Sequence, residues 1–373
     1  MKSTIKNTIL SLLFLASTVA CQETKTSKKE RPKAVKASYE AKENPALASL
    51  GKLKLSEYGF FNGKISDLNP IAEVYHYELN SALFTDYAFK KRFIYLPNGK
   101  SMTYDPEETF DFPKGAVIIK NFYYLTDFRK PEGEKEIIET RLLIKETSDW
   151  KALSYIWNKE QTDAFLEVAG AEKQVEWTHY DGTLKQVNYL VPNMNQCKSC
   201  HMSDKKIVPI GPKARHLNRS FVYEEKAVNQ LEYFESKAIL NGLVEKNDRP
   251  ANVEWDDEAA LLHDRAIAYL DINCGHCHNP KGPAKTSGLD LTVFAKTNME
   301  KGILKAPIAA GKGSGNLNYD IVPGNPKHSI LHYRMASTDP GIMMPEIGRS
   351  LAHKEGVELI SEWIKNMKVE SSK

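Results

Sequence analysis

The chain is poor in cysteine and in long apolar runs. Its 373 residues hold five cysteines; four fall in two short clusters and the fifth lies near the N-terminus, so none remains for a structural disulfide. After residue 20 no stretch reaches the ~18 apolar residues that span a bilayer. The formal net charge of +3 is small and does not indicate a nucleic-acid partner. The length suits about two domains, which must rely on packed cores.

What the chain does contain is the pattern C-x-x-C-H, twice, at residues 197–201 and 274–278. This spacing is the c-type haem attachment signature. Two thiols three positions apart can each bond one vinyl group of a porphyrin, and the adjacent histidine can bind the iron. A four-thiolate zinc site is the alternative, but it leaves both trailing histidines without a role. The sequence therefore predicts two covalent haem groups, attached through Cys197, Cys200, Cys274 and Cys277, with His201 and His278 as axial iron ligands.

The N-terminus is typical of an exported protein. Residues 1–20 combine a basic start with a short apolar core, which predicts a secretory signal peptide. Cys21 follows Ala20 and precedes polar residues, and this resembles a bacterial lipoprotein cleavage site, although Thr18 stands where leucine is usual. Ordinary cleavage after Ala20 is the alternative. With acylation at Cys21, residues 21–52 would form a disordered tether, and the protein would lie in the periplasm or at the cell surface, anchored to the membrane by lipid.

Residues 53–220 are predicted to form an antiparallel β-rich domain that ends in the first haem motif. Apolar and aromatic runs indicate the strands, and Asn-Gly at 98–99 and Asp-Gly at 181–182 indicate hairpin turns. A short helix is expected over residues 159–168. The expected strands cover residues 92–96, 100–104, 117–124, 137–144, 152–157, 175–180 and 183–191.

Residues 221–252 are expected to connect two domains through a helix over 222–240 and a polar linker. Just before them lie Arg215 and Arg219, close behind the first haem motif. Guanidinium groups suit carboxylates, so these arginines could pair with haem propionates. Solvated loop arginines are the alternative.

Residues 253–373 contain the second haem motif between two amphipathic segments, 257–273 and 354–367, with a Gly/Pro-rich region holding Met344-Pro345. This layout resembles small cytochrome c domains. The resemblance implies an axial methionine just before proline, which places that role on Met344; a thioether ligand raises the haem potential. The alternative is that Met344 packs the core and Met343 or Met335 binds the iron. The expected fold class is therefore α+β with two domains: an N-terminal antiparallel β-rich domain and a C-terminal all-α cytochrome c domain, each with one haem.

The β-rich part resembles the cytochrome c′-β group, through residues 112–120, Trp150 and the terminal C-x-x-C-H. The resemblance implies one haem on an antiparallel sheet, commonly five-coordinate. Some relatives tie a lysine covalently to the porphyrin, and the resemblance makes Lys120 the candidate for that role. A strand lysine facing water is the simpler interpretation. The sixth ligand of the first haem stays open among His216, Met194, Met202 and none.

Over residues 53–370 the chain resembles exported two-haem cytochromes of Gram-negative bacteria, through residues 81–88, 139–143, 155–158 and both haem motifs. The resemblance implies electron transfer between redox protein partners such as a dehydrogenase or another cytochrome. Two alternatives remain: a haem enzyme, either a peroxidase or an oxidoreductase for NO or hydroxylamine, and a gas-binding sensor. Di-haem peroxidases pair two α-helical cytochrome c domains, so the β-rich part weakens the peroxidase alternative.

Overall fold

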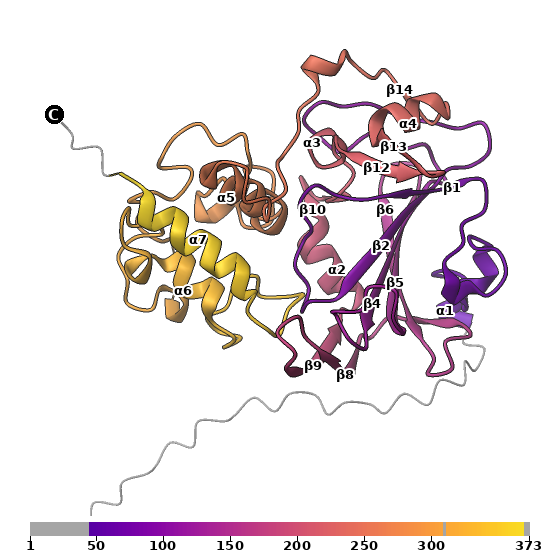
Figure 1. Ribbon diagram of the computed structural model, residues 1–373, viewed down its shortest axis with the longest axis horizontal. Coiled ribbons are helices and arrows are strands. Elements are labelled where there is room, and N and C mark those ends of the chain that lie inside the picture. The colour runs from indigo at the N-terminus through magenta and orange to yellow at the C-terminus, as the bar shows by residue number, and fades with distance from the viewer. Residues whose placement is uncertain (1–44, 309–310, 369–373) are drawn as a thin grey trace, which may run out of the picture. The chain divides into compact units, whose positions relative to one another are not determined.

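A six-stranded antiparallel sheet is the largest sheet of the structure, a computed structural model that describes residues 45–308 and 311–368 (Figure 1). The proposed signal peptide, Cys21 and residues 22–44 of the expected tether lie outside the described residues. Within the described ranges, no helix has both the length and the apolar character needed to cross a membrane. The sheet has the order β1 (Val74–Tyr77), β2 (Phe89–Tyr95), β4 (Val117–Leu125), β5 (Lys135–Lys145), β6 (Trp150–Trp157) and β7 (Ala164–Glu167).

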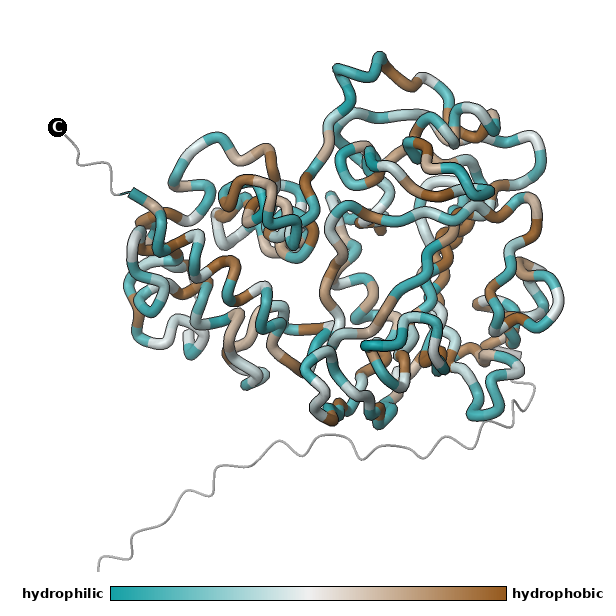
Figure 2. Tube along the Cα trace, in the orientation of Figure 1, coloured by the Kyte–Doolittle hydropathy of each residue, from teal (hydrophilic) through white to brown (hydrophobic). Residues whose placement is uncertain are grey.

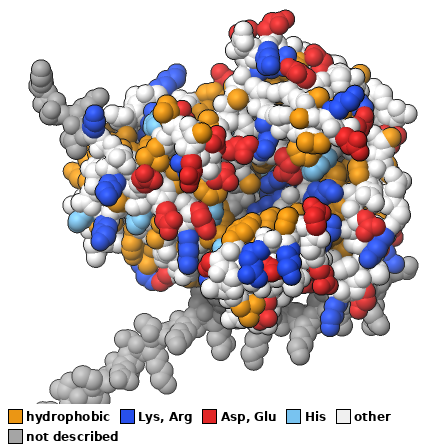
Figure 3. All heavy atoms as spheres, viewed as in Figure 1, with side chains coloured by type: hydrophobic (Ala, Val, Ile, Leu, Met, Phe, Trp, Pro, Cys, Tyr) orange, Lys and Arg blue, Asp and Glu red, His pale blue; other side chains and the backbone are white. Residues whose placement is uncertain are grey.

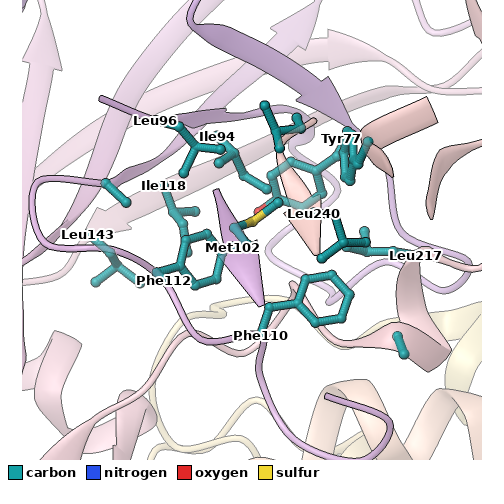
Figure 4. Packing of buried hydrophobic residues seen from close by; sticks show 14 of the residues in the cluster. Tyr77, Ile94, Leu96, Met102, Phe110, Phe112, Ile118, Leu143, Leu217 and Leu240 are labelled. Atoms are coloured by element: carbon teal, nitrogen blue, oxygen red, sulfur yellow. The ribbon is translucent and has the colours of Figure 1, made fainter. Parts of the chain in front are cut away.

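Both faces of the sheet are covered, which explains why its strands are apolar at consecutive positions. Successive side chains point to opposite faces, so Ile118 and Ile119 of β4 enter different apolar clusters. One cluster contains Ile118 and Leu143 together with side chains that follow the sheet in sequence, including Leu217 and Leu240 on the far side of Met102 (Figure 4). Figure 2 shows apolar residues along these strands and hydrophilic residues in many of the surrounding loops.

Several expected strands are confirmed. The strands around residues 117–124, 137–144 and 152–157 correspond to β4, β5 and β6. The expected Asp-Gly hairpin is also present, because β8 (Ala171–Thr178) pairs with β9 (Leu184–Val191) in antiparallel register. Directly after it, helix α2 (Met194–His201) carries the first haem motif.

The prediction of a hairpin with an Asn-Gly turn at residues 98–99 is wrong. Strand β2 pairs with β1 and β4, whereas β3 (Met102–Thr103) pairs in parallel with the distant β14 (Leu240–Asn241). Phe93 and Ile94 are both fully buried, and such a two-sided apolar strand gains more from a central place in the sheet than from an isolated hairpin.

Two expected helices also differ. Residues 159–168 contain strand β7 rather than a helix. Residues 222–240 begin with a hairpin of β12 (Ser220–Tyr223) and β13 (Lys226–Asn229), and helix α4 (Gln230–Ser236) is short. Glu224 and Glu225 both have positive φ, which makes the tight turn of this hairpin. The Asn229 side chain then caps α4.

The expected fold class, with a C-terminal all-α cytochrome c domain, is wrong. The described residues fall in one compact unit that is dominated by the β-sheet. In residues 253–368 the α-helices are short and long irregular segments separate them, with isolated β-bridges at Ile303–Ile321 and Tyr319–Ser329. Glycines with positive φ, such as Gly302 and Gly324, interrupt helical periodicity there. The helices are α5 (Leu262–Leu270), α6 (Ile330–Ala336) and α7 (Lys354–Asn366).

Helices α5 and α7 agree with the expected segments 257–273 and 354–367 in place, although α5 begins five residues late. A π-helical turn, Asp271–Gly275, extends α5 into the second haem motif. The two helices pack on α6 through a buried apolar cluster that includes Leu270, Met335, Ile360 and the motif residue Cys274.

Candidate functional site

The first haem motif is positioned by the N-terminus of α2. The Asn193 side chain accepts a hydrogen bond from the Gln196 backbone N–H, and the Gln196 side chain accepts one from the Asn193 N–H. This capping box fixes where the helix starts. Cys197 then packs against the apolar cluster on the sheet, and burial raises the pKa of its thiol.

His201 is oriented as a haem ligand requires. Its Nδ1 lies 2.9 Å from the Val208 carbonyl oxygen. A carbonyl can only accept, so Nδ1 carries the proton and Nε2 keeps a free lone pair. Burial lowers the pKa of His201 to about 4, so the ring is neutral near pH 7 and can bind a metal ion.

His278 has the same arrangement. Its Nδ1 lies 3.0 Å from Ser287 Oγ. The Ser287 hydroxyl donates its own proton to the Ala284 carbonyl, so it accepts from Nδ1 and leaves Nε2 free. Burial lowers the pKa of His278 to about 4. Both predicted proximal histidines are therefore neutral, with the same nitrogen available.

The two motifs lie against each other. The thiols of Cys200 and Cys277 are close enough to interact, and His276 also faces Cys200. The Asp204 N–H donates to the Lys281 carbonyl at 3.0 Å, which ties the segments behind the two motifs together. All four motif cysteines are free thiols. In the described residues no three or more His, Cys, Asp or Glu side chains gather as a metal site, so the geometry does not support the zinc alternative.

A cavity of about 630 Å³ lies between the motifs, and Cys200, His201 and His276 line it. Its wall includes a buried polar cluster. Arg215 donates to both oxygens of Asp271, at 2.8 and 3.1 Å. Burial opposes ionisation of Asp271, but the charge of Arg215 and the hydrogen bonds from Arg215 and Asn252 hold its pKa below the usual value.

His216, a candidate sixth ligand, belongs to this cluster. Its Nε2 lies 3.4 Å from Asp271 Oδ2, and its Nδ1 is buried without a hydrogen-bond partner among the described residues. Burial lowers the pKa of His216 to about 3. Met202 lines the same cavity. Met194 instead packs in the cluster that contains Phe93, on the other face of the sheet.

The two arginines behind the first motif are bound by the protein. Arg215 is buried, which contradicts the solvated interpretation. Arg219 donates to the Leu79 carbonyl at 2.7 Å and pairs with Glu254 at 2.9 Å.

A second cavity of about 60 Å³ lies on the other side of His201, against the sheet. Lys120 lines it together with Arg92, Arg141 and His201. The interpretation of Lys120 as a strand lysine facing water is therefore wrong. Burial, followed by the nearby charges of Arg92 and Lys90, lowers the pKa of Lys120 well below its usual value. In Figure 3 basic side chains are visible inside a hollow of the molecule, near β2 of Figure 1.

Within the described residues, Met344 is linked to His278 only through Arg334. Its N–H donates to the Arg334 carbonyl at 3.1 Å, and its carbonyl accepts from Arg349 at 3.0 Å. The charge of Arg334 contributes to the low pKa of His278. The alternative ligands Met343 and Met335 are both buried, and Met335 packs in the cluster that holds Cys274.

Comparison with models of protein families, with curated proteins and with solved structures found no match to this chain.

Three residues of these cavities were not predicted from the sequence: Arg92, Arg141 and Asp271. The orientation of Lys120 was not predicted either. Arg92 and Arg141 carried a usable signal, because each is followed by an apolar run in its strand, and a charge at such a place is rarely buried without a partner or a ligand. The signal for Asp271 was weaker: this residue stands about one helical turn before Cys274, on the same side of the predicted helix.

The residues present fit a haem group at each motif. Each motif offers two free thiols and a neutral histidine whose Nε2 is free. Beside the first motif, Arg92 Nη2 is buried without a hydrogen-bond partner among the described residues. An unpaired buried guanidinium nitrogen is costly, and a propionate is a group that could satisfy it.

Proposed function

We propose that this chain is an exported c-type cytochrome with two haems, which passes electrons between redox protein partners such as a dehydrogenase and another cytochrome. The observation that carries the proposal is the pair of C-x-x-C-H motifs, each with a histidine held through Nδ1 by a hydrogen bond. Cys197, Cys200 and His201 would hold one haem, and Cys274, Cys277 and His278, with Met344 as sixth ligand, the other.

The contact between the motifs supports electron transfer within the chain. When bound, haem supplies an iron that alternates between ferric and ferrous states, a one-electron couple. Cys200 and Cys277 lie side by side, so the attachment points of the two groups are neighbours. The hydrogen bonds to His201 and His278 hold both rings, which limits rearrangement when the charge changes.

Export and anchoring belong to the same proposal. The signal peptide, residues 1–20, would deliver the chain to the compartment where haem is attached, and an acylated Cys21 would retain it at the membrane.

A second candidate is a haem enzyme or gas sensor that uses an open iron at His201. The observation that favours it is the cavity lined by His201, Lys120 and Arg92, which would leave room for a small ligand beside the first motif.

A haem count tests the proposal. The denatured protein should retain two haems per chain in a pyridine haemochrome assay, because thioether bonds survive unfolding. Cys200→Ala and Cys277→Ala should each weaken or abolish attachment at their own motif only. Fewer than two haems in the wild type would contradict the proposal.

A further inference from the structure

A row of three cations crosses the sheet on the face that His201 covers. Arg92 on β2 is the register partner of Lys120 on β4, and Lys120 is the partner of Arg141 on β5. Residues paired in this way on neighbouring strands project from the same face, within about 5 Å of each other. Like charges directly opposite destabilise a sheet, so the row needs compensation.

The protein's own carboxylates compensate only part of this charge. Arg92 pairs with Glu78 at 2.6 Å, and Arg141 pairs with Glu139. Glu139 also accepts a hydrogen bond from Tyr189 at 2.5 Å. Neither carboxylate is paired with Lys120: within the described residues its ammonium forms no hydrogen bond or ion pair and lies 4.8 Å from the Phe122 ring centroid.

Two more basic groups near Lys120 are not fully paired within the described residues. Arg92 is 3% exposed, and its Nη2 is buried without a hydrogen-bond partner among the described residues. Lys90 stands two residues before Arg92 on the same face of β2, and within the described ranges its side chain has no ion pair. The face thus carries more positive than negative charge.

The apolar lining of this cavity favours binding of an anion. Lys120, Arg92 and Arg141 line the cavity of about 60 Å³ together with apolar side chains such as Ile118, Leu143 and Ile272. In such a medium an unpaired charge is costly and a charge-assisted hydrogen bond is strong. The volume holds only a few atoms, which suits a small oxyanion or one carboxylate group and excludes a larger organic acid.

We propose that this cavity binds an anionic oxygen group between Lys120 and Arg92. Two sources share that chemistry: a propionate of the haem attached at Cys197 and Cys200, or a small free oxyanion such as nitrite. Only the first source depends on the proposed function. The second would place a small anion next to His201.

The test compares Lys120→Met with Lys114→Met in the full-length, haem-loaded protein. Lys114 is exposed and lies before β4, so it is a matched control. Lys120→Arg retains the charge and should behave like the wild type. Each sample is first assayed for haem per chain, titrated calorimetrically with nitrite at low ionic strength, and then examined by resonance Raman spectroscopy for the propionate bending band.

A free anion predicts saturable nitrite binding to the wild type and to Lys114→Met, weakened about tenfold or more in Lys120→Met. A bound propionate predicts no nitrite binding but a propionate band that shifts in Lys120→Met alone.

The proposal is overturned if Lys120→Met, folded and with the wild-type haem count, changes neither the nitrite titration nor the propionate band. Should Lys120→Met fail to fold, Arg92→Gln is measured in the same way and must weaken the same signal. A wild type without covalent haem contradicts the proposed function instead, and its nitrite titration still tests the anion site.

Discussion

His216 Nε2 lies 3.4 Å from Asp271 Oδ2, although one residue follows the first haem motif and the other precedes the second. Arg215 binds the same carboxylate, so a single acidic side chain joins the segments around both motifs. The Asn252 side chain donates to it as well, at 2.9 Å. This buried carboxylate therefore contributes to the relative placement of the two motifs, beside the Asp204–Lys281 backbone hydrogen bond.

Removing that charge should destabilise the fold. In Asp271→Asn the guanidinium of Arg215 stays buried without its partner, and we expect the free energy of unfolding to fall by about 3–5 kcal/mol. Urea unfolding followed by tryptophan fluorescence measures this. Asp256→Asn is the control, because Asp256 is exposed, and it should change stability very little. Equal effects of the two variants would show that the buried pair contributes nothing.

The same carboxylate predicts a pH dependence. The pKa of Asp271 is held below its usual value in the folded state, so its contribution is complete above the unfolded value of about 3.9 and is lost as pH falls through the lower folded pKa. The wild type should thus lose stability on acidification more steeply than Asp271→Asn below about pH 4. Parallel acid-unfolding profiles would contradict the assignment.

Met344→Ala tests the second iron ligand. A methionine sulfur bound to ferric haem gives a far-red charge-transfer band, which should vanish in this variant, and the midpoint potential of that haem should fall by on the order of 100 mV. Met343→Ala is the neighbouring control and should retain the band. If only Met343→Ala loses it, the ligand is Met343.

Binding of carbon monoxide shows whether the iron of the first haem has a sixth protein ligand. No Met-Pro follows Cys200 within the β-rich part, so the iron at His201 should bind CO after reduction, whereas the iron held by His278 and Met344 should not. A Soret titration should then reach one CO per chain. A titration that reaches zero would indicate a sixth protein ligand, and His216→Ala and Met202→Ala would show which of the two it is.

Acylation at Cys21 is tested by metabolic labelling. The wild type should incorporate labelled fatty acid and sediment with membranes, and Cys21→Ser should do neither while keeping both haems. Ser17→Ala leaves the cysteine in place and controls for changes in the signal region. If Cys21→Ser still incorporates the label, Cys21 is not the acylated residue, and ordinary cleavage after Ala20 is the better interpretation.

The parts of this protein that could be predicted from sequence are those with local causes. The strands at 117–125 and 135–145 and helix α7 follow from patterns that operate within a few residues. The β8–β9 hairpin follows from Asp-Gly in the same way.

The errors have non-local causes. The predicted hairpin of β2 does not form, because pairing within the larger sheet buries both faces of this strand. The orientation of Lys120 depends on the register of three strands and on His201, which come from distant parts of the sequence. The prediction of a C-terminal all-α domain is wrong because two amphipathic segments predict two helices and not a whole domain, and much of residues 276–329 is irregular.

Strand β3 completes its pairing only when β14 is present, since Met102 is the partner of Leu240. A chain that emerges N-terminus first therefore exposes Cys197 and Cys200 before this ladder can close. Closing so long a loop is slow, because its entropy must be lost before the contacts form. For the haem attachment proposed here, the order of synthesis would thus provide an interval in which both thiols are exposed before the final tertiary closure.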